Sequence, residues 1–168
     1  MKAHDISIRA VNPNEATAIS AMVHQSFLKL AAESWEVEAQ QRFLAESGPE
    51  ALGGKISAAA YAIGAFFGDQ IVGFLLMPVP TRLGMLFVHP SRLRQGIGTK
   101  LWESARTQLE AEFPEVRTVE LNATPYSVEF YRATGYVPIS AQFIRSGARA
   151  IRMACWLPAR ALGAELPH

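Results

Sequence analysis

The stretch LFVHPSRLRQGIGTKL, residues 86–101, joins an apolar run to a helical pattern through a loop that contains two glycines. From Gly96 to about Phe113 an apolar residue recurs every four positions, which predicts one helix with a buried stripe. The first backbone N–H groups of a helix have no partner within it, and the helix dipole places positive charge there. A glycine loop that opens a helix therefore favours binding of a phosphate group.

The expected anion site consists of consecutive backbone N–H groups with a hydroxyl and a cation beside them. The N–H groups belong to Gln95, Gly96, Ile97, Gly98 and Thr99, with the Thr99 hydroxyl and the Arg94 guanidinium next to them. The loop lacks the Gly-Lys-Ser/Thr sequence of a P-loop. A dinucleotide fingerprint would require a third glycine where Leu101 stands. For the loop alone, a tight strand-to-helix turn without a ligand is the alternative.

The composition is typical of one globular domain. The chain has 168 residues, 49% of them hydrophobic, and a formal net charge of +1. Near neutrality argues against a nucleic-acid or membrane partner, and no apolar stretch reaches the length of a membrane span. The N-terminus lacks the apolar core of a signal peptide, and the single cysteine, Cys155, allows no internal disulfide. We expect one domain over residues 1–168, with a core at 6–157 and a C-terminal tail at 158–168, in the cytoplasm.

Periodicity and turn residues give the expected order of elements. Strands are expected at 6–11, on either side of a Gly68–Asp69 turn within 58–79, and at 82–88, 117–123, 136–144 and 148–157. Helices are expected at 12–31, 34–44, 96–113 and 124–134. Asn12 and Glu15 have capping-box spacing, Ser34 is the expected cap of the second helix, and SGPEALGG at 47–54 is an expected loop. This order predicts an α/β protein, with a mixed sheet and helices on both faces.

A second informative stretch is LNATPYSVEFYRATGY, residues 121–136. Asn122 ends a strand, and its amide can both donate and accept hydrogen bonds. Tyr131 lies on the short helix that follows. Its phenol, with an ordinary pKa of about 10, can give a proton to a leaving thiolate. Simple packing is favoured for Phe130 and is the main alternative for Tyr131.

Together the two stretches resemble the GCN5-related N-acetyltransferases, the GNAT family. In that family an R/Q-x-x-G-x-G/A loop binds the pyrophosphate of acetyl-CoA, and the next strand often ends in Asn before a helix with F-Y-x-x-x-G-F/Y. The resemblance covers about residues 6–157, with specific motifs in 83–138. It implies a mixed, mostly antiparallel sheet of six to seven strands, splayed in the middle and flanked by about four helices. Leu93 stands where the family has Arg or Gln, so acetyl-CoA could bind more weakly than in other members. We expect Arg94 to supply the missing positive charge.

The resemblance implies an enzyme that moves an acetyl group from acetyl-CoA to a primary amine of a small molecule or protein. The amine would attack directly in a ternary complex, with acetyl-CoA as cosubstrate. The pantetheine arm would lie along Leu86, Phe87 and Val88, with Asn122 opposite, and the N–H of Phe87 or Val88 would polarise the thioester carbonyl. Tyr131 would protonate the thiolate. No metal is expected, because the histidines lack ligand spacing, and a homodimer is left open.

Two other functions are open at this stage. One is a non-catalytic acyl-CoA-binding or regulatory module on the same fold, which Leu93 and the lack of an obvious base favour. The other is a nucleotide-binding α/β domain of another class. Five residues are candidates for the general base, each more readily explained as a surface residue: His24, Glu33, Glu36, Glu38 and Glu120. Four aromatic residues are candidates for an acceptor site, with core packing favoured for most: Trp35, Phe43, Tyr61 and Phe143.

Overall fold

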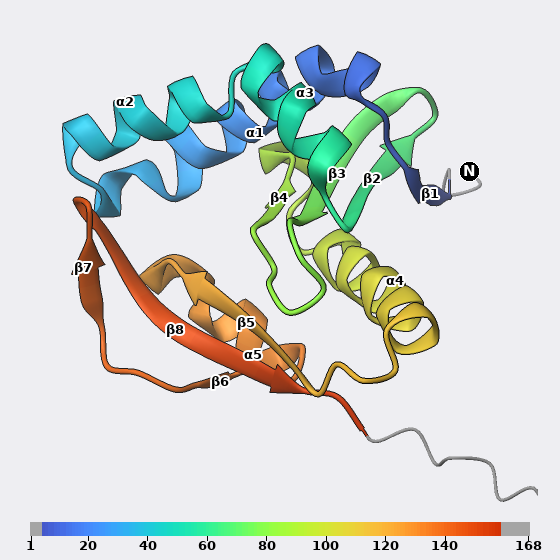
Figure 1. The fold of residues 1–168 in the computed structure, drawn as a ribbon. Coiled ribbons are helices and arrows are strands. Elements are labelled where there is room, and N and C mark those ends of the chain that lie inside the picture. The colour runs from blue at the N-terminus through green and yellow to red at the C-terminus, as the bar shows by residue number, and fades with distance from the viewer. Residues whose placement is uncertain (1–4, 159–168) are drawn as a thin grey trace, which may run out of the picture.

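Two sheets meet edge to edge in the computed structural model, which describes residues 5–158 (Figure 1). The first is antiparallel and contains, in spatial order, β1 (Ile6–Ala10), β2 (Tyr61–Phe67), β3 (Gln70–Met77) and β4 (Met85–Val88). In the second, β8 (Ala148–Trp156) pairs antiparallel with β5 (Thr118–Ala123), β6 (Val137–Pro138) and β7 (Phe143–Arg145). The mixed, mostly antiparallel architecture expected from the sequence is confirmed, with more strands than the six to seven predicted.

Helices cover both faces of the first sheet. The described helices are α1 (Ala16–Leu30), α2 (Val37–Glu46), α3 (Pro49–Ala58), α4 (Ile97–Glu112) and α5 (Val128–Ala133). α1 and α3 pack together on one face, while α4 packs on the other. Because both faces are covered, β3 is buried from Ile71 to Met77. The core is accordingly divided into two apolar clusters, one on each side of this sheet.

Several local predictions are confirmed by hydrogen bonds. The Asn12 side chain accepts from the Asn14 N–H at 3.0 Å, and the Glu15 carboxylate accepts from the Asn12 N–H at 3.0 Å, which completes the capping box. The turn that this box caps is a short 3₁₀ segment, and α1 begins after it at Ala16. The β2–β3 hairpin turns at Gly68–Asp69 as expected.

The prediction of a loop at 47–54 is wrong, because most of this segment belongs to α3. Pro49 occupies the first helical position, where its fixed φ is suited to a helix and its missing N–H costs nothing. Leu52 and Ile56 are buried against α1 and the sheet, and this burial outweighs the low helix propensity of Gly53 and Gly54.

Other boundaries also differ from expectation. Ser34 does not cap α2, which starts at Val37; the Ser34 hydroxyl donates instead to the Ala31 carbonyl at 3.0 Å. The run at 136–144 contains two short strands, β6 and β7, that pair with different parts of β8. Within the predicted tail, residues 159–168 lie outside the described part of the chain.

The two sheets share backbone hydrogen bonds at one end of the junction between them. The Leu83 N–H donates to the Glu120 carbonyl at 3.0 Å, and the Glu120 N–H donates to the Thr81 carbonyl at 3.0 Å. Beyond this short parallel contact β4 pairs with β3, and β5 pairs with β8, but not with each other. We call the opening between β4 and β5 beyond Glu120 the sheet gap. The expected splay in the middle of the sheet is thus confirmed.

The position of α4 beside the sheet gap depends on Gly73 of β3. A Cβ added at Gly73 would lie 2.9 Å from both Ile97 Cγ2 and Leu101 Cδ1. Both of those residues are fully buried in the first turns of α4. The bare backbone of Gly73 therefore lets the start of α4 pack closely on the sheet.

We expect Gly73→Ala to lower the free energy of unfolding by about 1–3 kcal/mol, because the added methyl group overpacks this contact. Chemical denaturation measures the change. Gly54→Ala in α3 is the matched control, since nothing lies within 4 Å of its added Cβ, and helix propensity predicts unchanged or slightly higher stability. Equal stability of the two variants would contradict the close packing.

Candidate active site

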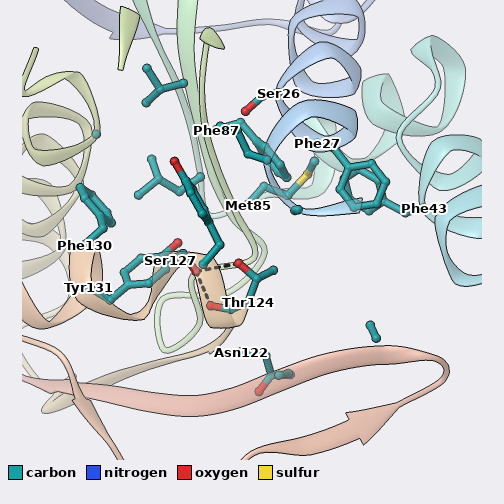
Figure 2. A pocket seen from close by; sticks show the side chains of 18 of the residues that line it. Ser26, Phe27, Phe43, Met85, Phe87, Asn122, Thr124, Ser127, Phe130 and Tyr131 are labelled. Carbon is teal, nitrogen blue, oxygen red and sulfur yellow. Dashed lines mark hydrogen bonds between the residues drawn. The ribbon is translucent and has the colours of Figure 1, made fainter. Parts of the chain in front are cut away.

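A cavity of about 1020 Å³ opens at the sheet gap, between elements that are far apart in the sequence. β4, the loop before α4, the start of α4, and α5 line one part of it. α1, α2 and the β7–β8 hairpin line the other part. Figure 2 shows Phe130 and Tyr131 on one side of this pocket, Phe27 and Phe43 across from them, and Asn122 on the strand below.

The N-terminus of α4 offers free backbone donors to the cavity. Gly96 has a φ of +77°, and the first helical hydrogen bond runs from the Lys100 N–H to the Gly96 carbonyl at 3.0 Å. The N–H groups of Ile97, Gly98 and Thr99 form no hydrogen bond within residues 5–158. These residues line the cavity together with Gly96 and Arg94, whereas Gln95, included in the predicted site, does not.

Gly98 is closely surrounded as well as free of a side chain. A Cβ there would lie 2.9 Å from Phe130 Cζ and 3.7 Å from Val88 Cγ2. Phe130 therefore packs directly on the helix start, in agreement with the packing role that its sequence position favours. A larger residue at position 98 would displace that ring or fill the entrance to the helix N-terminus.

Three consecutive residues before the glycines line the cavity: Arg92, Leu93 and Arg94. Arg94 is exposed and has a φ of +60°, which turns the chain sharply into the loop. The Arg92 guanidinium lies over the Phe67 ring, 4.0 Å from its centroid. Arg92 was not among the site residues predicted from the sequence. Its position next to Leu93, in the loop before the glycines, could have indicated it.

β4 presents its unpaired edge to the sheet gap. The His89 N–H donates to the Val72 carbonyl at 2.8 Å, and hydrogen bonds alternate along an antiparallel pair. This alternation directs the Phe87 N–H to β3 and directs those of Leu86 and Val88 to the gap. All three predicted residues of this strand line the cavity, and Val88 has the better-placed donor.

Asn122 faces the cavity from β5. Its Oδ1 atom is buried and has no hydrogen-bond partner among the described residues. A buried acceptor without a partner costs about 1–3 kcal/mol. The Asn122 side chain thus lines the sheet gap, while its Oδ1 atom is enclosed by the surrounding protein.

Tyr131 points its hydroxyl from α5 into the pocket, as Figure 2 shows. The side chain is 8% exposed and makes edge contacts with the rings of Phe130 and Tyr136, at centroid distances of 5.1 and 5.5 Å. Burial raises the pKa of Tyr131 above its ordinary value. The phenol therefore stays protonated at neutral pH and can serve as a proton donor.

Four aromatic residues form the opposite wall, which we call the aromatic wall: Phe27, Trp35, Phe43 and Phe87. Phe43 is central to it, with ring centroids 4.3 Å from Phe27, 5.6 Å from Trp35 and 5.8 Å from Phe87. Trp35 and Phe43 were acceptor-site candidates from the sequence. Phe27 belongs to the buried stripe of α1, and sequence periodicity alone does not distinguish a cavity wall from the core.

Two other aromatic candidates lie elsewhere. Tyr61 is buried in the core and its hydroxyl donates to the Glu112 carboxylate at 3.0 Å. Burial and the Glu112 carboxylate raise the pKa of Tyr61 to about 12. Phe143 is half-buried on β7 and does not line the cavity.

None of the five base candidates from the sequence lines the cavity: His24, Glu33, Glu36, Glu38 and Glu120. His24 Nε2 is hydrogen-bonded to the Ser47 hydroxyl at 2.9 Å. Within residues 5–158 the carboxylates that line the cavity belong to Glu46 on α2 and Glu129 on α5. Glu129 lies 3.7 Å from Arg132, on the part of the cavity that contains Tyr131.

The described part of the chain shows no group of metal ligands, no reactive thiol and no membrane-spanning helix. Residues 5–158 contain no cluster of three or more His, Cys, Asp or Glu side chains that could hold a metal ion. Cys155 is buried, and burial raises the pKa of its thiol, as expected for an inert core residue. No helix described here is long and apolar enough to span a bilayer.

Comparison with protein families and curated proteins gave one match. The model of the acetyltransferase (GNAT) domain matches residues 24–157, which is most of the chain. A comparison with curated proteins found no match.

The fold is similar to those of several solved acetyltransferases. A GCN5-related N-acetyltransferase from Rhodopseudomonas palustris gives a TM-score of 0.80 at 22% identity, covering 94% of this chain and 99% of that one. The PaiA N-acetyltransferase from Thermoplasma acidophilum, in complex with coenzyme A, gives 0.77 at 18% identity, covering 91% and 99%. The ribosomal-protein-S18-alanine N-acetyltransferase from Escherichia coli gives 0.63 at 18% identity, covering 98% and 100%. These likenesses establish the fold.

We expect Asn122→Leu to keep or raise the free energy of unfolding, by up to about 1 kcal/mol, because it removes a buried acceptor that has no partner. Asn12→Leu is the control. Its Oδ1 accepts the Asn14 N–H, so its loss should cost about 1 kcal/mol. Chemical denaturation of both variants checks the pair, and an equal loss in both would show that Asn122 has a partner in the free protein.

Proposed function

The chain belongs to the GNAT acetyltransferase family, and from this premise we propose that it transfers an acetyl group from acetyl-CoA to a primary amine of a small molecule or protein. The proposal rests chiefly on one observation. A single cavity joins the free N–H groups of α4, the unpaired edge of β4, the side chain of Asn122 and the buried phenol of Tyr131. The amine would attack the thioester directly, within a complex that holds both substrates.

In this proposal the start of α4 binds the diphosphate of acetyl-CoA. The N–H groups of Ile97, Gly98 and Thr99 are free to donate to it, and the helix dipole adds favourable charge. Arg92 and Arg94 line the cavity on either side of Leu93, at the position where the family has Arg or Gln. Their two guanidinium groups would compensate for the charge that Leu93 lacks.

The sheet gap would bind the pantetheine arm. Its amides match the unpaired N–H groups of Leu86 and Val88 in the manner of an added strand. The Asn122 side chain, which lines the cavity, would contact the arm from the other side. The arm would thus contact both edges of the gap.

Acetyl transfer requires mainly that the amine and the thioester are held together and that one group donates a proton to the thiolate. A thioester is already reactive towards an amine, and holding the two together supplies much of the rate. The Val88 N–H is directed to the gap, where it would polarise the thioester carbonyl. As the C–N bond forms and the C–S bond breaks, Tyr131 would give its proton to the departing thiolate, and the proton that the amine nitrogen loses would restore the phenol.

We expect Tyr131→Phe to lower kcat by about 10²–10⁴-fold, because it removes the proposed proton donor, and to change coenzyme A affinity little. Steady-state release of the coenzyme A thiol and calorimetric titration measure the two quantities. Tyr136→Phe is the matched control, since the Tyr136 hydroxyl is buried and has no partner among the described residues. Similar loss of rate in both variants would contradict the assignment.

The pH dependence of the reaction should show a single rising limb. Burial raises the pKa of Tyr131, so the phenol remains protonated up to and beyond about pH 10. The acceptor must lose its ammonium proton before attack, so kcat/KM should increase with pH until the amine is neutral. A decline between pH 7 and 9 in the wild-type profile, absent from that of Tyr131→Phe, would contradict the raised pKa of the acid.

The overall proposal is tested by thermal unfolding with coenzyme A and by thiol release over a panel of primary amines. We expect coenzyme A, but not NAD or ATP, to raise the unfolding temperature, and acetyl-CoA to turn over with at least one amine class. Protection by coenzyme A without turnover of any amine would favour a non-catalytic acyl-CoA-binding module. Protection by NAD or ATP alone would indicate a nucleotide-binding domain of another class.

A further inference from the structure

The charges around the cavity are strongly unbalanced, although the chain as a whole is nearly neutral. Within the described residues six arginines line it, against two glutamates: Arg42, Arg82, Arg92, Arg94, Arg145 and Arg149. Arg92 and Arg94 lie in the segment before α4, where the proposed binding of the diphosphate explains their positive charge. The other arginines lie beyond that loop, so the diphosphate gives no reason for their presence.

Three of these arginines lie together where α2 meets the β7–β8 hairpin. Arg42 on α2 donates from Nη2 to the Ser146 carbonyl in the hairpin turn, at 3.2 Å. Arg145 pairs with Ala148 across that turn, which places Arg145 and Arg149 on opposite faces of the hairpin at its tip. We call these three residues the arginine rim. All are exposed, and within residues 5–158 none lies within ion-pair distance of a carboxylate.

The hairpin tip is fixed against the α1–α2 connection, as Figure 1 shows. The Glu36 N–H donates to the Gly147 carbonyl at 2.9 Å, and Trp35 forms a β-bridge with Ala148. Gly147 is packed so closely that an added Cβ would lie 2.9 Å from Glu36 Oε2 and 3.1 Å from Ala39 Cβ. These backbone contacts hold the hairpin tip beside the segment before α2 at this end of the cavity.

The aromatic wall lies at the same end. Trp35 both forms the bridge to Ala148 and contacts the Phe27 ring, with centroids 5.0 Å apart. An acceptor at this end therefore meets flat apolar side chains on one side and guanidinium groups at the hairpin. Glu46 is the one carboxylate of the described residues that lines this part of the cavity.

We propose that the acceptor is a small amine that also carries a carboxylate and an aromatic or other apolar group, as an aromatic α-amino acid does. This deepens the acetyl transfer proposed above and rests on it. Arginine pairs with carboxylate through strong, charge-assisted hydrogen bonds, and the apolar group would pack on the aromatic wall. The rim would repel polycationic amines, and its charge would lower the pKa of the bound ammonium, which favours the neutral form that attacks.

Matched amines test the carboxylate requirement directly. We would compare L-phenylalanine with phenethylamine and L-tryptophan with tryptamine, since each pair differs by the carboxylate alone, and include spermidine as a polycation. Initial rates of thiol release from acetyl-CoA should give a kcat/KM about tenfold or more higher for each amino acid, which corresponds to about 1.4 kcal/mol. Added salt should reduce the preference, because the rim is exposed.

Single variants assign the preference to residues. Arg42→Gln and Arg145→Gln should each lower kcat/KM for L-phenylalanine by about tenfold and leave that for phenethylamine unchanged. Arg152→Gln is the matched control, since Arg152 is an exposed arginine of the same hairpin that does not line the cavity. An equal effect of Arg152→Gln would show that overall charge, not the rim, sets the preference, and would overturn the inference.

The outcomes separate this inference from the proposed function. A preference for phenethylamine, tryptamine or spermidine would overturn the inference while acetyl transfer stands. Protection by coenzyme A with neither turnover nor calorimetric binding of either amino acid would also overturn it. Absence of coenzyme A binding would overturn the proposed function, and the inference with it.

Discussion

The point where the segment before β4 stops pairing with β5 determines the rest of this structure. Two hydrogen bonds, between Leu83 and Glu120 and between Glu120 and Thr81, join the two sheets before their edges separate. Past that point Leu86 and Val88 have backbone groups that no strand satisfies, and Asn122 has a buried oxygen without a partner in the described chain. A continuous sheet would have satisfied the backbone groups of Leu86 and Val88 internally and left no room for a ligand between the strands.

The donor and acceptor sides use different faces of the protein and meet at the sheet gap. α4 and Tyr131 belong to the larger apolar cluster, where tight packing holds the start of the helix and the Tyr131 ring beside the cavity. Phe43 and Phe87 pack against the smaller cluster, beneath α1 and α3. Rigid packing on each face thus holds two chemically different surfaces at the ends of one cavity.

The sequence predicted the parts of the site that depend on local structure. Gly96, Gly98, Asn122 and Tyr131 each lie at a strand–helix junction, where residue type and spacing determine the backbone and the chemistry over a few residues. The strand and helix order followed from periodicity for the same reason. α3 was missed because its helical state depends on burial of Leu52 and Ile56 by distant segments, which glycine and proline content does not report.

The acceptor end was less accessible to sequence reasoning, because it is assembled from distant parts of the chain. Arg42 and Ser146 are 104 residues apart in sequence, yet they are joined by a hydrogen bond. Phe27 and Phe87 fit ordinary core patterns. Of the carboxylates considered as bases, Glu33, Glu36 and Glu38 are exposed on α2 or near it, and Glu120 is half-buried on β5. Long-range pairing of the hairpin tip with the α1–α2 connection decides which side chains face the cavity, and no local motif encodes that pairing.

The contact between Gly147 and Glu36 is made by backbone atoms. The backbone part of this junction therefore does not depend on which side chains the turn and α2 carry, as long as position 147 stays glycine. Neither segment supplies the amides, the phenol or the asparagine that we propose to bind and activate the thioester. If the proposed function holds, selection or a protein engineer could change the acceptor specificity at exposed positions of these two segments without altering the residues proposed to bind the acyl donor.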